Sequence, residues 1–321
     1  MSLIVQKFGG SSVADAQKLL RSAALMRDAH DAGHDVVAVV SAQGDGTDCL
    51  LQKARELSPA PPPRELDALL ATGEQASAAL AAMALASLGV PAVSLCAWQA
   101  PIGGEGAHGD ARIVSIGTER IRAELSRRRV VVVAGFLGVN AAGATVTLGR
   151  GGSDYSAVAL AAALKAARCV IYTDVDGVYT ADPRLCPTAR RLSRVSYGDM
   201  LALSRAGAQV LHDKCVALAR ERGVEPEVRA CTPDGAGTLV CAEGGNEAVV
   251  GAARSERGDG RAVVTAVGEA APSLEKIARE ALSAAGVAVL GAEVSERALS
   301  LTVPAKQSRE ALRAVHDALV E

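Results

Sequence analysis

The N-terminal segment LIVQKFGGSS places one lysine almost directly before two adjacent glycines. Glycines let the backbone approach a ligand without a Cβ clash, and free backbone amides at a turn bind anions. Lys7 adds a compact positive charge beside Gly9 and Gly10. These residues could form a cradle for a phosphate group, although a tight structural turn explains them equally well. The segment matches neither the dinucleotide GxGxxG pattern nor the GxxxxGKS/T loop.

A second glycine-rich stretch, TLGRGGSDYSAVALAAAL, opens directly into an Ala/Leu-rich helix. The guanidinium of Arg150 can bind a carboxylate through two parallel hydrogen bonds. Asp154 lies near the expected helix start, where an isolated carboxylate is most simply an N-terminal cap. The neighbouring arginine and glycines weaken the interpretation as a cap alone.

Two further segments carry carboxylates with open interpretations. In YTDVDGVYTADPR, Asp174, Asp176 and Asp182 could bind Mg²⁺ or hydrogen-bond a ribose or an adenine edge. Asp-Gly and Asp-Pro are also common turn formers, so each aspartate alone indicates a turn. Glu74 lies inside a predicted Ala/Leu-rich helix, where a carboxylate needs a partner. A substrate ammonium group and a distant arginine suit it equally well.

Composition excludes several classes of protein. The 321 residues carry a formal net charge of -2 and only 2% aromatic residues, so neither a basic nucleic-acid surface nor a base-stacking platform is expected. The seven cysteines form no CxxC pair, which argues against a zinc ribbon, and their odd number in a long chain argues against a disulfide framework. The N-terminus lacks the pattern of a signal peptide, and Gly89 and Pro91 interrupt the least polar window. We expect a cytoplasmic protein that binds no nucleic acid and no membrane.

The elements that must position these residues follow from alternating patterns. β-Branched runs predict strands at 3–8, 35–42, 91–97, 130–136 and 169–175, and Ala/Leu-rich segments predict helices at 14–32, 64–88, 117–128 and 154–167. Continuous apolar strands that alternate with helices indicate a parallel sheet covered on both faces. Ligands of such sheets bind beyond the carboxyl ends of the strands, where the candidate residues lie.

The pattern changes after the strand-like segment GTLVC, and we expect a boundary within residues 242–247. Beyond it we predict a strand, a helix begun by Ser273 and ended by Gly286, a hairpin-like strand pair and a closing helix. This β-α-β-β-α order describes a small α/β module. The sequence thus predicts two domains, residues 1–243 and 244–321.

Taken together and in order, these motifs resemble the aspartate kinases of the amino acid kinase family. The matching segments are KFGGSSV, VVSAQGDGTD, ATGEQ, HGDARI, VVVAGFLGVN, TLGRGGSDYSAVALAAAL and YTDVDGVYTADPR. The resemblance implies a three-layer α/β/α amino acid kinase-like domain with a mainly parallel sheet. The C-terminal module resembles an ACT domain, an α/β module of ferredoxin-like fold.

The resemblance also implies an activity, the transfer of the ATP γ-phosphate to the β-carboxylate of L-aspartate. Lys7, Gly9, Gly10 and Asp154 match the catalytic residues. The residues that would bind the amino acid are Thr47, Glu74, Arg150, Gly152 and Ser153. The residues that would line the nucleotide site are Lys7, Phe8, Gly9, Gly10, Ser12, Thr173, Asp174, Tyr179, Asp182 and Arg184. Mg²⁺ would bind mainly through the phosphates of ATP, without a protein metal site.

The sequence departs from the family pattern at several positions. The loop PIGGEGAHGDARI differs at 103–105, Ala71 replaces a serine, and Gln209 replaces a lysine expected on the nucleotide side. These departures leave two alternatives open: a kinase for another amino or oxo acid, and a weakly catalytic regulatory subunit that binds an amino acid. About 75 residues follow the kinase part, enough for one ACT module, and we expect weak or absent feedback by lysine or threonine. A homodimer through this module is expected.

Overall fold

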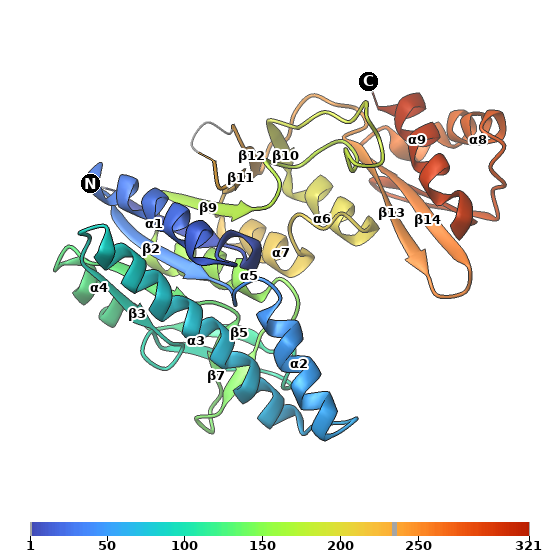
Figure 1. Ribbon diagram of the computed structural model, residues 1–321. Helices are drawn as coiled ribbons and strands as arrows, with labels where there is room; N and C mark the ends of the chain where they lie inside the picture. The colour runs from blue at the N-terminus through green and yellow to red at the C-terminus, as the bar shows by residue number, and fades with distance from the viewer. Residues whose placement is uncertain (1, 233–235, 321) are drawn as a thin grey trace. The chain divides into compact units, whose positions relative to one another are not determined.

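The computed structural model describes residues 2–232 and 236–320 of the chain (Figure 1). The chain folds as two units, of which the first comprises residues 1–176 and 221–235 and the second 177–220 and 236–321. The predicted domains, 1–243 and 244–321, divide the chain by sequence pattern rather than by contacts in space, and that division stays a prediction.

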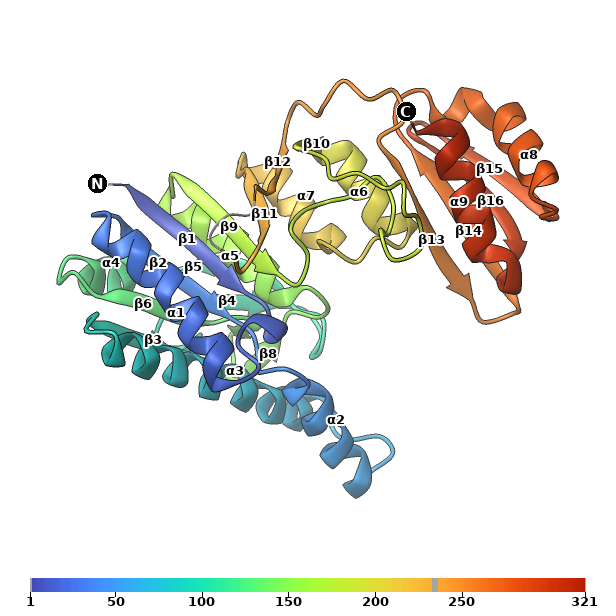
Figure 2. The same ribbon diagram turned by 45° about the horizontal axis from the view of Figure 1, so that its top comes forward.

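The first unit is built on a parallel sheet with the strand order β11-β9-β1-β2-β6-β3 (Figure 2). All five neighbouring pairs are parallel. The strands are β1 (Leu3–Phe8), β2 (Asp35–Val40), β3 (Ala92–Leu95), β6 (Val130–Ala134), β9 (Arg168–Thr173) and β11 (Pro226–Ala230). The predicted strands and the parallel sheet are confirmed, and β11 is an addition that the sequence reading missed.

Helices cover both faces of this sheet, as predicted. Within β1, the Gln6 side chain reaches the Leu25 carbonyl oxygen at 3.5 Å, whereas the next residue, Lys7, pairs with Asp154. Successive strand residues point to opposite faces, so the helices that carry Leu25 and Asp154 lie on opposite faces. The helices of this unit are α1 (Ala16–Asp31), α2 (Gly46–Leu57), α3 (Pro63–Ser87), α4 (Glu119–Leu125) and α5 (Gly152–Leu164), of which α2 was not predicted. α1 and α3 pack against each other on the Gln6 face.

A small second sheet has the strand order β5-β4-β7-β8. Its strands are β4 (Ile102–Glu105), β5 (Arg112–Ile116), β7 (Leu137–Val139) and β8 (Thr145–Thr147). Gly103 and Gly104, which the sequence reading placed in a variable substrate loop, are residues of β4. A Cβ on Gly104 would lie 2.5 Å from the Val146 side chain, so glycine at this position serves the packing of the small sheet.

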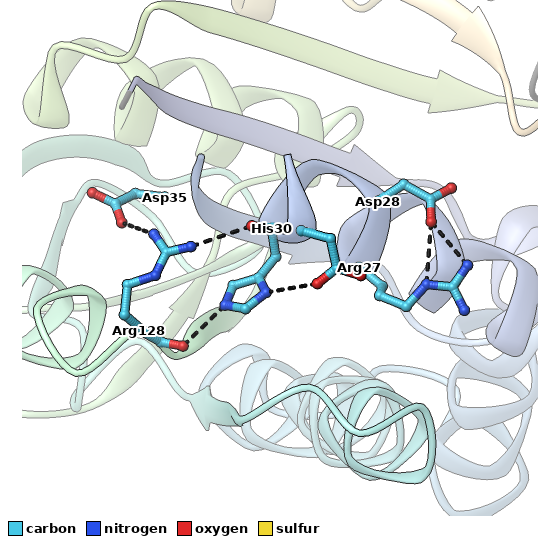
Figure 3. A network of polar contacts seen from close by, with 6 residues as sticks. Arg27, Asp28, His30, Asp35 and Arg128 are labelled. Atoms are coloured by element: carbon cyan, nitrogen blue, oxygen red, sulfur yellow. Dashed lines mark hydrogen bonds and ion pairs between the residues drawn. The ribbon is translucent and has the colours of Figure 1, made fainter. Parts of the chain in front are cut away.

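The amino ends of the strands are held by a polar network (Figure 3). His30, near the end of α1, donates from Nε2 to the Arg128 carbonyl oxygen at 3.1 Å, and the Arg128 guanidinium donates back to the His30 carbonyl at 3.2 Å. The same guanidinium lies 3.3 Å from a carboxylate oxygen of Asp35, the first residue of β2. Arg128 adopts a left-handed conformation with φ 56°. The reciprocal pair therefore ties α1 to the turn before β6.

A buried carboxylate lies in the same region. Glu124, in α4, is fully buried and forms ion pairs with Arg120 at 2.8 Å, Arg129 at 2.9 Å and Arg127 at 3.5 Å. The three guanidinium groups remain partly exposed to solvent. A buried anion surrounded by cations is compensated within the protein.

The second unit contains a four-stranded antiparallel sheet with the order β13-β14-β16-β15. Its strands are β13 (Gly251–Arg257), β14 (Arg261–Val267), β15 (Gly291–Ser295) and β16 (Ala298–Pro304), and its helices are α8 (Glu275–Ala284) and α9 (Ser308–Leu319). This antiparallel sheet with two helices is consistent with the predicted ACT-like module. The β13 strand was not predicted. Ser273 belongs to a 3-10 helix (Ala271–Leu274) before α8 and does not cap the helix, because Leu274 occupies that position.

The remaining elements of the second unit are the parallel strands β10 (Arg194–Ser196) and β12 (Thr238–Cys241), with α6 (Tyr197–Ala206) and α7 (Asp213–Arg222). Of these elements, α6 packs against β13 and β14. The segment after β9 is bonded to the antiparallel sheet and to α9: Thr180 Oγ1 lies 2.9 Å from His316 Nε2 in α9, and the Thr180 carbonyl accepts the Ala252 amide at 2.7 Å. Ala181 and Cys186 are buried in the same apolar core as β14, β16 and α9.

Among the described residues, α3 alone is long and apolar enough to cross a membrane. Core helices of water-soluble proteins meet the same criterion. α3 packs against α1, β3 and β6, and its buried face carries Asp67 and Glu74. Two buried carboxylates on a helix packed within the protein favour a core helix.

Candidate active site

An ion pair joins β1 to α5 at the carboxyl ends of the parallel strands. Lys7 Nζ lies 2.6 Å from Asp154 Oδ1, and both side chains are almost entirely buried. Asp154 is in the first turn of α5 but forms no cap hydrogen bond; the N-cap position is held by Gly151. The positive end of the helix dipole and the ammonium group both stabilise the carboxylate. From the sequence alone, the simplest interpretation of Asp154 was an N-terminal cap of the helix. In the structure its carboxylate instead pairs with Lys7.

Space after β1 requires glycine at position 10 and is tight at position 9. A Cβ on Gly9 would lie 3.3 Å from Lys7 Nζ, and a Cβ on Gly10 would lie 2.7 Å from the Ala42 carbonyl oxygen. The Gly9 amide donates to the Tyr172 carbonyl at 3.2 Å, so in this conformation that amide is bonded within the protein. The expectation that both glycine amides are free for a phosphate therefore does not fit Gly9. Gly10 begins a 3-10 helix (Gly10–Ser12).

Two predicted nucleotide residues have inward-facing side chains. The Phe8 ring is fully buried and stacks on Tyr172, with ring centroids 4.8 Å apart and an interplanar angle of 11°. Ser12 is buried, and its carbonyl accepts the Ser22 hydroxyl at 2.8 Å. Packing explains why the sequence has a phenylalanine at position 8.

Glu74 is a buried carboxylate that lacks a counter-ion among the described residues. Its Oε1 accepts the Ala42 amide at 3.1 Å, and its Oε2 has no hydrogen-bond partner in the described part of the chain. Burial raises the pKa of Glu74 to about 7, a rise that the hydrogen bond from Ala42 partly opposes. The distant arginine that the sequence left open as a partner is not found there. Because a desolvated, half-satisfied carboxylate is costly, this oxygen is suited to an incoming cation.

The turn between β8 and α5 presents Arg150 to solvent. Gly149 and Gly151 on either side of it have φ of 76° and 67°, which favours glycine at both positions. Arg150 is exposed and makes no hydrogen bond or ion pair with any residue that the structure describes. Its guanidinium is therefore available for a carboxylate.

Gly152 and Ser153 follow at the start of α5. A Cβ on Gly152 would lie 2.6 Å from the Phe136 ring, and Phe136 itself has a left-handed φ of 67°. Ser153 is buried against Gly135, the residue after β6: a Cβ on Gly135 would lie 2.9 Å from the Ser153 hydroxyl. Thr47, the second residue of α2, is half-buried.

Sequence reasoning missed a second buried carboxylate on α3. Asp67 is only 1% exposed and accepts hydrogen bonds from His108, Gly109 and Thr147. A signal was present, because Asp67 and Glu74 are seven residues apart, which places both side chains on one face of a helix.

The other predicted nucleotide residues divide between the two units. In the first unit, the Thr173 hydroxyl donates to Asp174 at 3.0 Å. In the second unit, the Arg184 guanidinium binds Asp182 through two hydrogen bonds of 2.9 Å, and this pairing lowers the pKa of Asp182. Tyr179 forms an isolated bridge with Arg191. Among the residues that the structure describes, no three His, Cys, Asp or Glu side chains group closely enough to hold a metal ion.

Comparisons with known proteins show the family of this chain. The profile of the Amino acid kinase family matches residues 2–229, which contain every candidate residue of the first unit. The chain is 52% identical over 241 residues to an aspartokinase of Mycolicibacterium smegmatis, covering 75% of this chain and 57% of the relative. It is 50% identical over 240 residues to aspartokinase 2 of Bacillus subtilis, again covering 75% of this chain and 59% of the relative. The chain thus spans less than three fifths of the length of these curated relatives.

Solved structures show the same fold. Aspartokinase III of E. coli, in complex with aspartate and ADP, is similar with a TM-score of 0.85 at 22% identity, over 99% of each chain. An aspartate kinase from Synechocystis is similar with a TM-score of 0.68 at 29% identity, over 99% of this chain and 69% of that one. A UMP kinase from Ureaplasma parvum is similar with a TM-score of 0.54, over 75% of this chain. The fold therefore extends to enzymes that phosphorylate different acceptors.

Proposed function

Because the chain belongs to the amino acid kinase family, we propose that it catalyses the ATP-dependent phosphorylation of the β-carboxylate of L-aspartate to 4-phospho-L-aspartate. Support for this acceptor comes from the 50–52% identity with aspartokinases over the residues that contain the site. The observation that carries the reaction type is the buried Lys7–Asp154 pair, with 2.6 Å between Nζ and Oδ1, at the carboxyl end of β1.

The amino acid would be held by its two charged groups. Arg150, exposed and unpaired among the described residues, binds the α-carboxylate with its planar guanidinium. The unpartnered Oε2 of Glu74 accepts the α-ammonium group. A bound ammonium group restores the charged form of Glu74, whose pKa burial has raised to about 7. Thr47 and Ser153 add hydroxyl groups beside these anchors.

The phosphoryl transfer depends on position and charge. An oxygen of the substrate β-carboxylate forms the new P–O bond as the bond to ADP breaks, and negative charge spreads over the transferred group. The Lys7 ammonium compensates that charge, and Asp154 holds the ammonium in place. Mg²⁺, bound through the ATP phosphates, would add further positive charge. Asp154 is committed to Lys7 rather than to a metal ion.

ATP would be bound through the glycine turn and the segments after β9. In the first unit we assign Gly10, Thr173 and Asp174 to this role, with Gly9, Phe8 and Ser12 supporting the turn. In the second unit we assign Tyr179, Asp182 and Arg184. The exposed Arg184 side chain, although paired with Asp182, can contact an anionic or planar group.

We further propose a cytoplasmic homodimer formed through the C-terminal sheet. β15 is an edge strand of that sheet, and Val294 within it and Leu290 just before it are more than half exposed. Edge strands readily pair with a second copy. Light scattering of the purified chain should give twice the monomer mass, and a monomer at micromolar concentration would contradict this assembly.

Trapping of the acyl phosphate tests the activity directly. The protein is incubated with ATP, Mg²⁺, hydroxylamine and L-aspartate, and the hydroxamate is measured. We expect a signal with L-aspartate well above that with L-glutamate or oxaloacetate, and its loss in Lys7→Ala and Arg150→Ala. A larger signal with another acceptor would favour a kinase of that acid. Aspartate binding without hydroxamate would favour a regulatory subunit.

A further inference from the structure

Asp67 has an unusually complete set of hydrogen bonds for a carboxylate in a helix interior. Its Oδ1 accepts the Thr147 hydroxyl at 2.6 Å. Its Oδ2 accepts His108 Nδ1 at 2.7 Å and the backbone amides of Gly109 and Thr147, each at 3.1 Å. All four contacts come from groups that can donate, which matches the acceptor-only character of an ionised carboxylate.

The four donors belong to two segments far apart in the sequence from α3. His108 and Gly109 lie in the loop between β4 and β5, and Thr147 ends β8. These segments are also bonded to each other, because the Ala111 amide donates to the Thr147 carbonyl at 2.9 Å. Asp67 is thus the point on α3 to which both are attached.

Thr147 connects this anchor to the proposed substrate arginine. Arg150 follows only three residues later, in a turn whose glycines have left-handed backbones. The Leu148 amide between them donates to the Phe136 carbonyl at 3.0 Å, so the start of the turn is held on both sides. Displacement of Thr147 would therefore shift Arg150.

Glu74 lies on the same helix as Asp67, seven residues later and on the same face. The helix is rigid over two turns, about 10 Å at 1.5 Å per residue. The bond between Asp67 and Thr147 therefore sets the position of the Arg150 turn relative to Glu74.

We propose that Asp67 is a positioning residue for the amino acid substrate, one that sets the span between the Arg150 guanidinium and the Glu74 carboxylate. Asp67 does not touch the substrate; it acts through Thr147. This inference rests on the proposed function and goes beyond it, because it names the residue that matches the site to the distance between an amino acid's carboxylate and ammonium groups. Nucleotide binding is not expected to depend on it.

The test compares Asp67→Ala with Asp67→Asn. Asparagine can keep the geometry: its oxygen accepts the three N–H groups, and its amide donates to the Thr147 hydroxyl, which can rotate to accept. Alanine removes every bond. Asp67→Ala should raise the KM for L-aspartate about 10–100-fold, because small misplacements of binding groups have effects of that size. The KM for ATP should change less than threefold, and Asp67→Asn should restore most of the aspartate affinity.

Two further variants make the test independent of folding defects. Thr147→Val removes the hydroxyl donor alone and should raise the KM for aspartate about 3–10-fold, the value of one hydrogen bond. Glu124→Gln changes another buried carboxylate of the first unit, remote from Arg150, and should leave that KM within about twofold. If Asp67→Ala does not fold, the KM for aspartate of Thr147→Val tests the proposal in its place.

Calorimetric binding of L-aspartate separates this inference from the proposed function. The inference is overturned if Asp67→Ala or Thr147→Val folds and binds aspartate as the wild type does, if both KM values rise equally, or if Asp67→Asn is as defective as Asp67→Ala. If the wild type binds aspartate but forms no hydroxamate, the proposed reaction is wrong. The aspartate affinities of the variants would still test the role of Asp67. A wild-type protein that neither binds nor phosphorylates aspartate would overturn both.

Discussion

The two ends of the central parallel sheet differ in whether every buried charge has a partner within the protein. At the amino ends, Glu124 is surrounded by three arginines, and His30 and Arg128 exchange hydrogen bonds. At the carboxyl ends, Glu74 has one backbone donor and an unpartnered oxygen, and Arg150 has no partner in the described part of the chain. Both ends bury carboxylates that are paired within the protein, Glu124 at one end and Asp154 at the other, but only the carboxyl ends also hold a buried carboxylate, Glu74, without a counter-ion among the described residues.

This difference separates structural charge from charge kept for a ligand. An ion pair that is satisfied within the protein stabilises the fold and leaves no charged group available to a ligand. A carboxylate and a guanidinium on different segments, each incomplete, can be completed by one zwitterion. Perturbed, incompletely paired groups in one region are typical of functional sites.

The largest expected effect is at Lys7. Lys7→Ala removes the cation at the transferred phosphate and leaves Asp154 buried without its partner. We expect kcat to fall by a factor of at least about 10²–10³, as for loss of an electrostatic group in a transition state, and unfolding free energy to fall by about 3–5 kcal/mol. Hydroxamate kinetics and urea unfolding measure the two effects. Arg127→Ala, an exposed cation at the opposite end, is the control and should change neither by much.

Glu74→Gln tests the carboxyl ends of the sheet, where Glu74 is incompletely paired, through the pH dependence of stability. The pKa of Glu74 is raised by burial from 4.5 to about 7. The folded protein therefore holds this proton more tightly than the unfolded chain, so the stability that it contributes is complete below pH 4.5 and is lost as the pH rises through 7. The total loss is up to about 3 kcal/mol, since each pKa unit corresponds to about 1.4 kcal/mol.

The measurement is the difference in unfolding free energy between wild type and Glu74→Gln from pH 4 to pH 8. The glutamine variant should gain relative to the wild type as the pH rises, and it should bind L-aspartate weakly. A difference that stays flat across this range would show that Glu74 titrates normally and would remove the contrast between the two ends.

Glu124→Ala should lower the stability of the protein without changing substrate binding, the opposite of the result expected for Glu74→Gln at high pH. The change leaves three arginines without their shared anion, but their partial exposure lets water compensate them, so we expect a loss of about 1–3 kcal/mol in unfolding free energy. The KM for aspartate should not change. Thermal unfolding and steady-state kinetics test this pair of outcomes, and a raised KM would mean that the amino ends also control the site.

The smallest expected effect is at His30. His30→Ala removes the Nε2 bond to the Arg128 carbonyl but leaves the Arg128–Asp35 pair, so the cost should be about 1 kcal/mol. Urea unfolding at pH 7 measures it. The Arg27→Ala variant, whose exposed ion pair with Asp28 is separate from that bond, should cost less, and an equal cost would contradict the role given to His30.

The sequence predicted those parts of the fold that local patterns encode. The runs at Leu3–Phe8, Asp35–Val40 and Val130–Ala134 are rich in β-branched residues and alternate with helical segments, so their strands and parallel pairing could be expected. Strands of the small sheet, such as β7 and β8, have three residues each and contain glycine or threonine, so no period is long enough to recognise. β13 carries two arginines and a glutamate, which hid it.

The candidate site was only partly predictable for a different reason. Lys7, Glu74 and Arg150 are unusual residues in their local contexts and could be singled out. The bonds that place them are long-range: Asp67 and Thr147 are 80 positions apart, and nothing in either local sequence marks the other. The Gly9 amide was expected to be free, but only the structure places the Tyr172 carbonyl 3.2 Å from it.

The attachment of Thr180 to α9 and β13 has a practical consequence for dissecting this chain. A fragment that stops at residue 243 would lose His316 and Ala252, the partners of Thr180, and would strip the apolar cover from Ala181 and Cys186. Such a fragment would expose apolar surface that is normally buried, together with the Cys186 thiol, and it should precipitate on expression. The C-terminal quarter therefore keeps the segment after β9 soluble by covering its apolar residues.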